Sequence, residues 1–553
     1  MPRVVEKITL VILALAGSAG LVHVVLSFQE REAKSISGIV QDENGPVRGA
    51  VVRVQATDNC TTTSEDGSFV LDGLSSQAEL IITAWADGYF VGWTKAYPAA
   101  ANIRITLKRY YSGDNPEYDW ISTEGTEGSK SCGHCMPGVY AEWKADAHSR
   151  SAVNPRFLTM YTGTDMDGNR GPLTRHGSSR DYGRFPLRPD PKEPYYGPGY
   201  VLDFPETAGN CAACHAPAAA AKPGQAYDVR VDKTSGLATE GVFCEFCHKI
   251  GRVTLDPETA LPYANMPGVL SMRFHRPEKG QELFFGPFDD VTRRVSYLPL
   301  QKHSAFCAPC HFGQFWGVQV YNSYGEWLAS PYSHPEKGKT CQDCHMPKTK
   351  NTTFALAEKG GVRRPAGCIV SHRMPGADDV DLLQDTASLS IRARRVGDRI
   401  KVEAQVTNEK AGHHIPTGHP ARNILLVISA TDIRGQELAC FSKQIIPDWG
   451  GKGSAPDDYA GRPGKGYAKI LEELWTEISP TAAYWRQTVL RGDTRIPALA
   501  TDITQYEFHA PKDSGPSTIE AKLIFRRAFK ELARQKKWHT RDILMEERRI
   551  VVP

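Results

Sequence analysis

The chain has 553 residues, which is too long for a single hydrophobic core, so we expect a multidomain protein. Its 66 Lys and Arg nearly balance its 63 Asp and Glu, and the formal net charge of +3 gives no reason to expect a nucleic acid or an anionic membrane surface as partner. The 49 Gly and 37 Pro favour long loops.

The first predicted element is a membrane anchor over residues 1–30. Residues 8–28 form an apolar run that is long enough to cross a bilayer, and Arg3 and Lys7 precede it. Because the positive charges lie before the run, we expect a single-pass transmembrane helix in the cytoplasmic membrane, with the body of the protein on the periplasmic or extracellular side. A cleaved signal peptide is the alternative, since residues 16–19 are small, and both interpretations predict export.

Residues 36–110 are expected to form a small β-sandwich. Short apolar runs at residues 36–40, 50–54, 67–71 and 79–82 are separated by turn residues such as Glu43-Asn44-Gly45. The segment resembles the carboxypeptidase regulatory-like fold through Gly45-Pro46-Val47-Arg48-Gly49-Ala50, Asp66-Gly67-Ser68-Phe69 and Ala86-Asp87-Gly88-Tyr89. No peptidase site is visible, so this resemblance implies a spacer or docking module.

Five pairs of cysteines, each separated by two residues, follow between residues 132 and 345. Four are followed at once by histidine, in Cys211-Ala212-Ala213-Cys214-His215, Cys244-Glu245-Phe246-Cys247-His248, Cys307-Ala308-Pro309-Cys310-His311 and Cys341-Gln342-Asp343-Cys344-His345; the fifth is Cys132-Gly133-His134-Cys135-Met136. Cys-x-x-Cys-His is the signature of c-type haem attachment, in which two thioethers hold the porphyrin and the histidine ligates the iron. Zinc held by four sulfurs is the alternative, but zinc pairs do not require a histidine at the next position each time.

The pattern therefore predicts five haem c groups, four at Cys-x-x-Cys-His and one at Cys-x-x-Cys-Met. One cysteine pair per roughly 43 residues is too dense for separate domains, so we expect one mainly α-helical or irregular multihaem cytochrome c domain over residues 120–375. Haems packed this closely pass electrons to one another, with potentials set by axial ligands and burial.

The second axial ligand of each haem is expected among the remaining histidines. His148 lies on a predicted helix after the first cysteine pair, and the other candidates are His303, His334, His372, His413 and His414. We expect the loop histidines His176, His275 and His419 to be solvated, because they stand beside Arg, Gly or Pro.

Met136 stands where the other motifs have histidine, and three interpretations stay open. A thioether ligand favours reduced iron and raises the potential of that haem. If Met136 does not bind, one face of the haem is open to a substrate. Cys132 and Cys135 could instead form a disulfide and hold no cofactor.

The middle of the chain resembles membrane-associated multihaem c-type cytochromes, a group that includes tetrahaem quinol oxidases and haem-based reductases of nitrogen and sulfur oxyanions. The resemblance rests on the step from Trp143 to His148, on Asp203-Phe204-Pro205 before Cys211, and on Glu326-Trp327-Leu328-Ala329-Ser330-Pro331-Tyr332 before Cys341-Gln342-Asp343-Cys344-His345-Met346-Pro347. It implies haem binding over residues 120–375. The reductases of this group vary the proximal position to Lys, so Met136 departs from their pattern.

Residues 385–553 are expected to form a second β-sandwich, with strands at residues 387–391, 400–406, 424–428, 519–525 and 549–552 and a helix near residues 527–537. Its histidine-rich loop at residues 411–420 is either a metal-free surface loop or a clamp in which His413 or His414 reaches a haem. Of the cysteines outside the five pairs, Cys368 and Cys440 are our candidates for a disulfide.

These features favour electron transfer by an exported pentahaem cytochrome c, between a membrane donor and an acceptor outside the cytoplasm. Redox partner proteins or a membrane quinol are the expected partners, nucleic acid is not, and an oligomer is compatible with the sequence. The rival is an oxidoreductase that acts on a small nitrogen or sulfur species at the Cys-x-x-Cys-Met haem. A third class is an assembly or filament subunit built from the two β-sandwiches.

Overall fold

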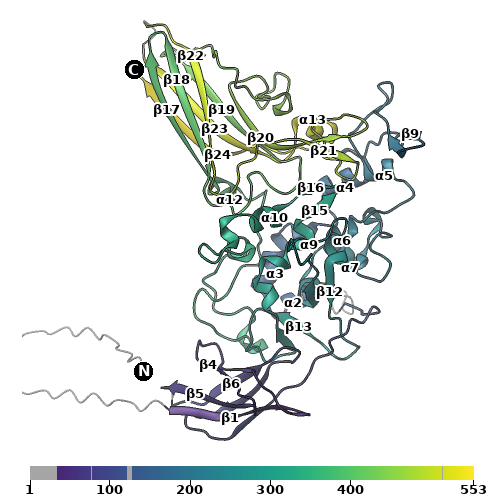
Figure 1. Ribbon diagram of the computed structural model, residues 1–553, viewed down its shortest axis with the longest axis vertical. Helices are drawn as coiled ribbons and strands as arrows, with labels where there is room; N and C mark the ends of the chain where they lie inside the picture. The colour runs from purple at the N-terminus through teal and green to yellow at the C-terminus, as the bar shows by residue number, and fades with distance from the viewer. Residues whose placement is uncertain (1–33, 76, 121–127, 513–514) are drawn as a thin grey trace, which may run out of the picture.

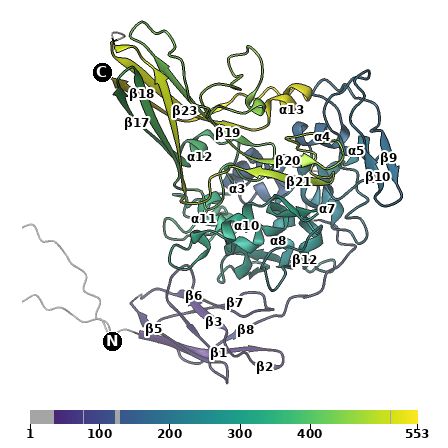
Figure 2. The same ribbon diagram turned by 45° about the horizontal axis from the view of Figure 1, so that its top comes forward.

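The computed structural model describes residues 34–75, 77–120, 128–512 and 515–553. Three bodies follow one another along its long axis (Figure 1): an N-terminal module (residues 34–110), a middle region of short helices (residues 128–375) and a C-terminal module (residues 380–553). The turned view in Figure 2 shows the same order, with β20, β21 and α13 of the C-terminal module lying over the middle region.

The N-terminal module packs two four-stranded sheets against each other. One contains β2 (Gly45–Pro46), β1 (Lys34–Asp42), β5 (Ser68–Leu74) and β8 (Ile103–Thr106), and the other contains β4 (Cys60–Thr62), β3 (Val51–Val54), β6 (Leu80–Trp85) and β7 (Gly92–Ala96). Alternating apolar residues such as Ile36, Val40, Val52 and Ile82 point inward and are fully buried. The module therefore has a hydrophobic core of its own.

The middle region consists of short helices and two-stranded sheets joined by long loops. The helices are α2 (Lys130–Gly133), α3 (Pro137–Ala145), α4 (Pro155–Thr162), α5 (Tyr200–Asp203), α6 (Ala212–His215), α7 (Pro217–Ala220), α8 (Cys244–Lys249), α9 (Ala308–His311), α10 (Ser323–Leu328) and α11 (Cys341–His345). The strand pairs are β9 (His176–Ser179) with β10 (Gly183–Pro186), β11 (Ile250–Val253) with β12 (Met272–Phe274), β13 (Phe284–Gly286) with β14 (Val295–Tyr297), and β15 (Gly313–Phe315) with β16 (Val318–Tyr321).

Single turns of 3-10 helix fill many of the connections. They are η1 (His148–Arg150), η2 (Val231–Lys233), η3 (Gly236–Glu240), η4 (Gly268–Ser271), η5 (Pro299–Lys302), η6 (Ser304–Phe306), η7 (Pro331–Ser333), η8 (Ala357–Lys359) and, in the C-terminal module, η9 (Asp448–Gly450).

The C-terminal module also packs two sheets over a common core. The first contains β17 (Ala387–Val396), β18 (Arg399–Asn408) and β22 (Thr501–His509), and the second contains β21 (Thr488–Asp493), β20 (Gly464–Glu473), β19 (Asn423–Thr431), β23 (Ser517–Arg526) and β24 (Ile543–Val552). Two short helices, α12 (Val380–Gln384) and α13 (Lys530–Gln535), flank the sheets. Leu389, Val402, Leu426 and Leu523 lie in the core between the two layers.

The predicted fold class requires correction. No helix of the described residues is long and apolar enough to cross a membrane, and residues 1–30, where we predicted a transmembrane helix, lie outside the described part of the chain. The middle, expected to be mainly α-helical or irregular, has few helical residues and several small sheets: its longest described helix, α3, has nine residues, and two-stranded sheets separate the helices. Pro begins α3, α4 and α7, and the helices around the cysteine motifs last little more than one turn.

The two modules contact the middle region in different ways. Arg53 of β3 forms paired 3.0 Å hydrogen bonds with Asp289, and Trp85 Nε1 donates to Ser296 Oγ at 3.0 Å. On the other side, Arg486 of the C-terminal module donates to Asp203 of α5 at 2.8 Å and to Glu473 of β20 at 2.7 Å, and both carboxylates are almost completely buried. The C-terminal contact is thus the more deeply buried of the two.

Candidate functional site

Four of the five cysteine pairs lie on or at the start of one short helix each, while in the first pair Cys132 lies in α2 and Cys135 in the turn that follows it. Cys211 and Cys307 stand at the N-caps of α6 and α9, while Cys244 and Cys341 are the first residues of α8 and α11. One helical turn brings residues i and i+3 to the same face, so both sulfurs of a pair point to one side. The helix α11 is fixed further by a capping box between Thr340 and Asp343.

The cysteines of different motifs contact one another. The thiols that lie close enough to shift each other's pKa are those of Cys132 and Cys244, of Cys214 and Cys310, and of Cys307 and Cys341. Cys247 also lies close to Cys310, whose charge together with burial raises the pKa of Cys247 to about 12. The five motifs therefore form one continuous group and are not five separate sites.

Two pairs of histidine rings from distant segments lie close together in this group, one with its ring planes inclined by 60° and the other with its planes nearly parallel, at 12°. The ring centroids of His148 and His311 are 6.1 Å apart, and those of His345 and His413 are 6.3 Å apart. A metal stands about 2 Å from each imidazole nitrogen and the ring centre lies about 1 Å behind it, so two rings on opposite sides of one metal have centroids roughly 6 Å apart. Both separations fit an iron atom between the rings.

Two further histidines lie near motif histidines. Burial first, and then the charge of His248, lowers the pKa of His372 to about 4; burial first, and then the charges of Arg422 and His215, lower the pKa of His419 to about 3. These rings are neutral at pH 7, and the neutral imidazole is the form that ligates a metal.

Backbone oxygens and one carboxylate lie within hydrogen-bond distance of the Nδ1 atoms of five of these histidines. His215 Nδ1 lies 3.1 Å from Ser151 O, His248 Nδ1 2.5 Å from Phe285 O, and His345 Nδ1 2.7 Å from Pro375 O. In the same way, His148 Nδ1 lies 2.6 Å from an Asp146 carboxylate oxygen and His413 Nδ1 3.0 Å from His414 O. When Nδ1–H donates to such an oxygen, Nε2 is left free of a proton and available to a metal.

Other predicted ligands are placed elsewhere. His303 and His334 are exposed on the surface, and neither belongs to a facing pair among the described residues. The His414 ring turns toward Glu326, with Nδ1 3.5 Å from the carboxylate. Cys368 and Cys440 are free, so the suggested disulfide is absent.

Sequence reasoning missed His419. It was expected to be solvated, but burial and neighbouring charges lower its pKa, and its ring centroid lies 6.1 Å from that of the half-buried Tyr484. This position could have been predicted from the sequence, because His419 lies in the same histidine-rich loop as His413, and the whole loop lies against the cysteine motifs.

Glu326 of α10 fixes this loop. Its carboxylate accepts hydrogen bonds from Thr417 Oγ1 and Arg495 Nη1, both at 2.5 Å, and from the His414 backbone N–H at 3.3 Å. Burial tends to raise the pKa of Glu326, but the hydrogen bonds from His414 and Thr417 and the charge of Arg495 outweigh it and hold the pKa at about 2. The carboxylate is therefore ionised at neutral pH and ties the C-terminal module to the haem motifs.

The Cys132 motif has a different environment. Met136 is half-buried at the N-cap of α3, and the Cys135 backbone oxygen accepts a hydrogen bond from Leu356 N–H at 2.9 Å. Near Cys132, the Tyr118 hydroxyl donates to the Glu245 carboxylate at 2.5 Å, and this carboxylate lies 3.6 Å from the Nζ atom of the fully buried Lys249. Burial lowers the pKa of Lys249 to about 8, and both Glu245 and Lys249 act electrostatically on Cys132.

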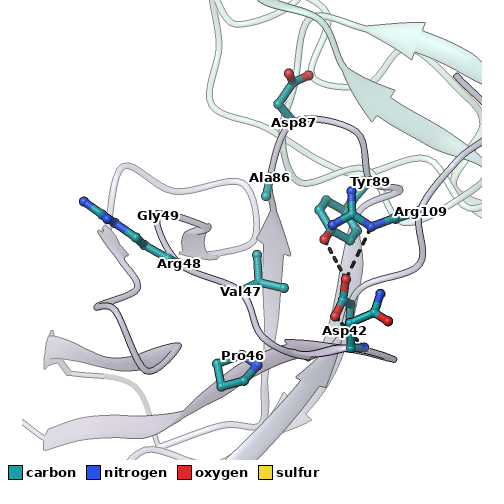
Figure 3. Close-up of a pocket in the computed structure, with 10 residues that line it drawn as sticks. Asp42, Pro46, Val47, Arg48, Gly49, Ala86, Asp87, Tyr89 and Arg109 are labelled. Atoms are coloured by element: carbon teal, nitrogen blue, oxygen red, sulfur yellow. Dashed lines mark hydrogen bonds and ion pairs between the residues drawn. The ribbon is translucent and has the colours of Figure 1, made fainter.

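A separate cleft of about 570 Å³ lies on the N-terminal module (Figure 3). Tyr89 donates a 2.7 Å hydrogen bond to Asp42, and the Arg109 guanidinium lies 4.5 Å from the centre of the Tyr89 ring. Residues 46–49, 86, 87 and 89, which belong to the segments with the carboxypeptidase regulatory-like resemblance, line this cleft. It contains no residue of the cysteine motifs.

Comparisons with known proteins support the fold. No protein-family model and no curated protein matches the chain significantly. A solved structure of a penta-heme cytochrome c552 from Thermochromatium tepidum is similar with a TM-score of 0.52 and 20% sequence identity, covering 76% of this chain and 98% of that one. A cohesin–X-dockerin complex from Acetivibrio cellulolyticus aligns at a TM-score of only 0.13 over 14% of the chain, which carries no argument. The chain therefore shares its fold, over three quarters of its length, with a multihaem c-type cytochrome.

Proposed function

We propose that the protein is an exported pentahaem c-type cytochrome that transfers electrons. The five cysteine pairs attach the haems, and His215, His248, His311 and His345 ligate four of the irons. Their distal partners in this proposal are His419, His372, His148 and His413, respectively. Bound haem iron supplies the one-electron chemistry, and the protein holds each iron between two imidazoles and excludes water from it.

The facing histidine rings carry this proposal. His345 and His413 are far apart in sequence, yet their nearly parallel imidazoles have centroids 6.3 Å apart, and each Nδ1 lies near an oxygen. A metal ligated between the two rings accounts for this arrangement. The contacts among cysteines of neighbouring motifs support electron transfer, because haems attached to touching cysteines lie close enough to exchange electrons.

We further propose that the donor and acceptor both lie outside the cytoplasm. Thioether attachment takes place there, and redox proteins or a membrane quinol are donors of suitable chemistry. The shared fold with a penta-heme cytochrome c552 supports the haem number in this proposal.

A pyridine haemochrome assay tests the proposal. Full-length protein from a host with haem-ligation machinery should contain five haems per chain, and the double substitution Cys211→Ala and Cys214→Ala should remove one. Cys368→Ala is the matched control, since Cys368 is exposed and outside the motifs, and should leave five. Fewer than four haems per chain in the unaltered protein would contradict the proposal.

A second candidate function is reduction or oxidation of a small nitrogen or sulfur species at the Met136 haem. The specific observation is the buried cluster of Tyr118, Glu245 and Lys249 beside Cys132, because such reactions move protons together with electrons and these groups can hold a proton there.

Ligand binding separates the two candidates. A high-spin signal that disappears on addition of nitrite or carbon monoxide favours the enzyme, whereas haems that are all low-spin and do not respond favour electron transfer alone. Redox titration of a Met136→His variant adds a second measurement: if Met136 ligates the iron, the midpoint potential of that haem should fall, because imidazole favours oxidised iron relative to a thioether.

A further inference from the structure

Three arginines meet where the middle region joins the C-terminal module, and their charges are not balanced. Arg422 precedes β19 and Arg527 follows β23. These strands are antiparallel with Asn423 opposite Arg526, so one further step of the same register places Arg422 opposite Arg527. Like charges directly opposite each other are unfavourable in a sheet.

Arg156, at the start of α4, is the third member of this arginine cluster. Its Nη2 donates to Thr540 Oγ1 at 2.5 Å, while Arg422 Nη1 donates to Thr417 O at 3.1 Å and Arg527 Nε donates to Ala377 O at 3.0 Å. All these acceptors are uncharged. Each guanidinium has five N–H donors, so most of the donors have no partner of opposite charge.

Unlike these three half-buried arginines, the most deeply buried arginine side chains at this junction are paired with carboxylates. Arg486 contacts Asp203 and Glu473, and Arg495 contacts Glu326 and Asp493. Among the described residues, no Asp or Glu oxygen lies within 4.0 Å of Arg156, Arg422 or Arg527; the carboxylate of Asp378 acts on them from farther away. Burial first, and then the charges of Arg527 and Arg156, lower the pKa of Arg422 to about 10.

The cluster flanks both histidines of one proposed haem. Phe157, next to Arg156, stacks on the His215 ring with centroids 3.6 Å apart, and the Arg422 backbone N–H donates to the His419 carbonyl at 3.1 Å. A haem held between His215 and His419 carries two propionate carboxylates. Guanidinium groups bind carboxylates through paired, charge-assisted hydrogen bonds.

We propose that Arg156, Arg422 and Arg527 bind the propionates of the haem attached at Cys211 and Cys214. This inference rests on the proposed function, since it requires that haem. The bound guanidinium groups neutralise the propionates, and this favours the reduced iron, which carries one positive charge less than the oxidised iron. The cluster thus raises the potential of this haem and also joins the middle region to the C-terminal module through it.

An EPR-monitored redox titration tests the inference. Arg422→Gln and Arg527→Gln should each lower the equilibrium constant for reduction of one of the five haems about tenfold, which is about 59 mV for a one-electron couple. Arg527→Lys keeps the positive charge but loses the paired N–H donors of the guanidinium. Its midpoint should therefore lie between those of the glutamine variant and the unaltered protein. Arg394→Gln, on the exposed face of β17, is the matched control and should change nothing.

The outcomes separate this inference from the proposed function. Five haems with unchanged midpoints in both glutamine variants would overturn the arginine assignment and leave the pentahaem proposal intact. If the site binds a free oxyanion instead, replacing chloride by sulfate at constant ionic strength should shift the midpoint of the unaltered protein, and that result would also overturn it. If a glutamine variant fails to fold, an Arg527→Lys midpoint below that of the unaltered protein at one haem only, with no shift on exchange of chloride for sulfate, supports the assignment. An unchanged Arg527→Lys midpoint, or a shift at a second haem, contradicts it.

Discussion

The two β-sandwich modules differ in what they give to the middle region. The C-terminal module contributes His413, His419 and the deeply buried Arg486 to the space around the cysteine motifs. The N-terminal module contributes no histidine to the described pairs, and its Arg53–Asp289 contact is partly exposed, with 21% and 16% of the two side chains accessible. Similar folds therefore differ in position: one completes the proposed haem site and the other is attached to its outside.

The largest expected effect comes from the loop that completes the site. His413→Ala should remove one axial ligand and convert one haem from low-spin to high-spin, which absorption and EPR spectra measure. His303→Ala is the matched control because His303 is exposed, and its spectrum should stay the same. An unchanged spectrum for His413→Ala would mean that the C-terminal module does not complete the site.

The buried charge network at the C-terminal contact should have the next largest effect. Arg486→Met leaves Asp203 and Glu473 buried without their partner, and breaking a buried pair in this way costs about 3–5 kcal/mol. Chemical denaturation of the full chain measures this loss. A loss below about 1 kcal/mol would show that the contact is not a principal attachment.

Acid should weaken a second attachment of the C-terminal module, the contact of Glu326 with Arg495 and the loop at residues 411–420. Its pKa falls from an ordinary 4.5 to about 2 in the folded protein, so its stabilisation is present above pH 4.5 and is lost as the pH falls toward 2. The shift corresponds to about 3 kcal/mol. Denaturation at pH 7 and pH 3 should show a pH-dependent loss that Glu326→Gln reduces; equal pH dependence in both proteins would contradict this role.

The smallest effect is expected at the N-terminal contact. Arg53→Ala removes two hydrogen bonds to Asp289 at a partly exposed position, which should cost about 1 kcal/mol. The haem spectrum should not change, because no described haem ligand candidate lies on this module. A spectral change would contradict the conclusion that only the C-terminal module contributes to the proposed haem site.

The sequence predicted the parts of the site whose residues are close together in the chain, but not the contacts between distant segments. The cysteines of one motif lie within a helical turn, so their spacing alone predicts where two sulfurs point. The partners of the motif histidines come from distant segments, and closeness in sequence was misleading: His303 lies four residues before Cys307 and yet is exposed.

The loop at residues 411–420 shows why the remainder could not be predicted. Gly418 and Pro420 suggest an exposed turn around His419, and Gly418 does adopt a φ of +77°. A Cβ at this position would stand 2.7 Å from Arg422 Nη1, so the glycine also allows a close approach inside the protein. The contacts of Glu326 and Arg495 with this loop arise only from the tertiary structure.

A crystal structure with anomalous scattering measured at the iron edge tests the central claim most directly. Five iron peaks are predicted, with one between His148 and His311 and another between His345 and His413. Absence of iron between these two pairs of rings would contradict the account.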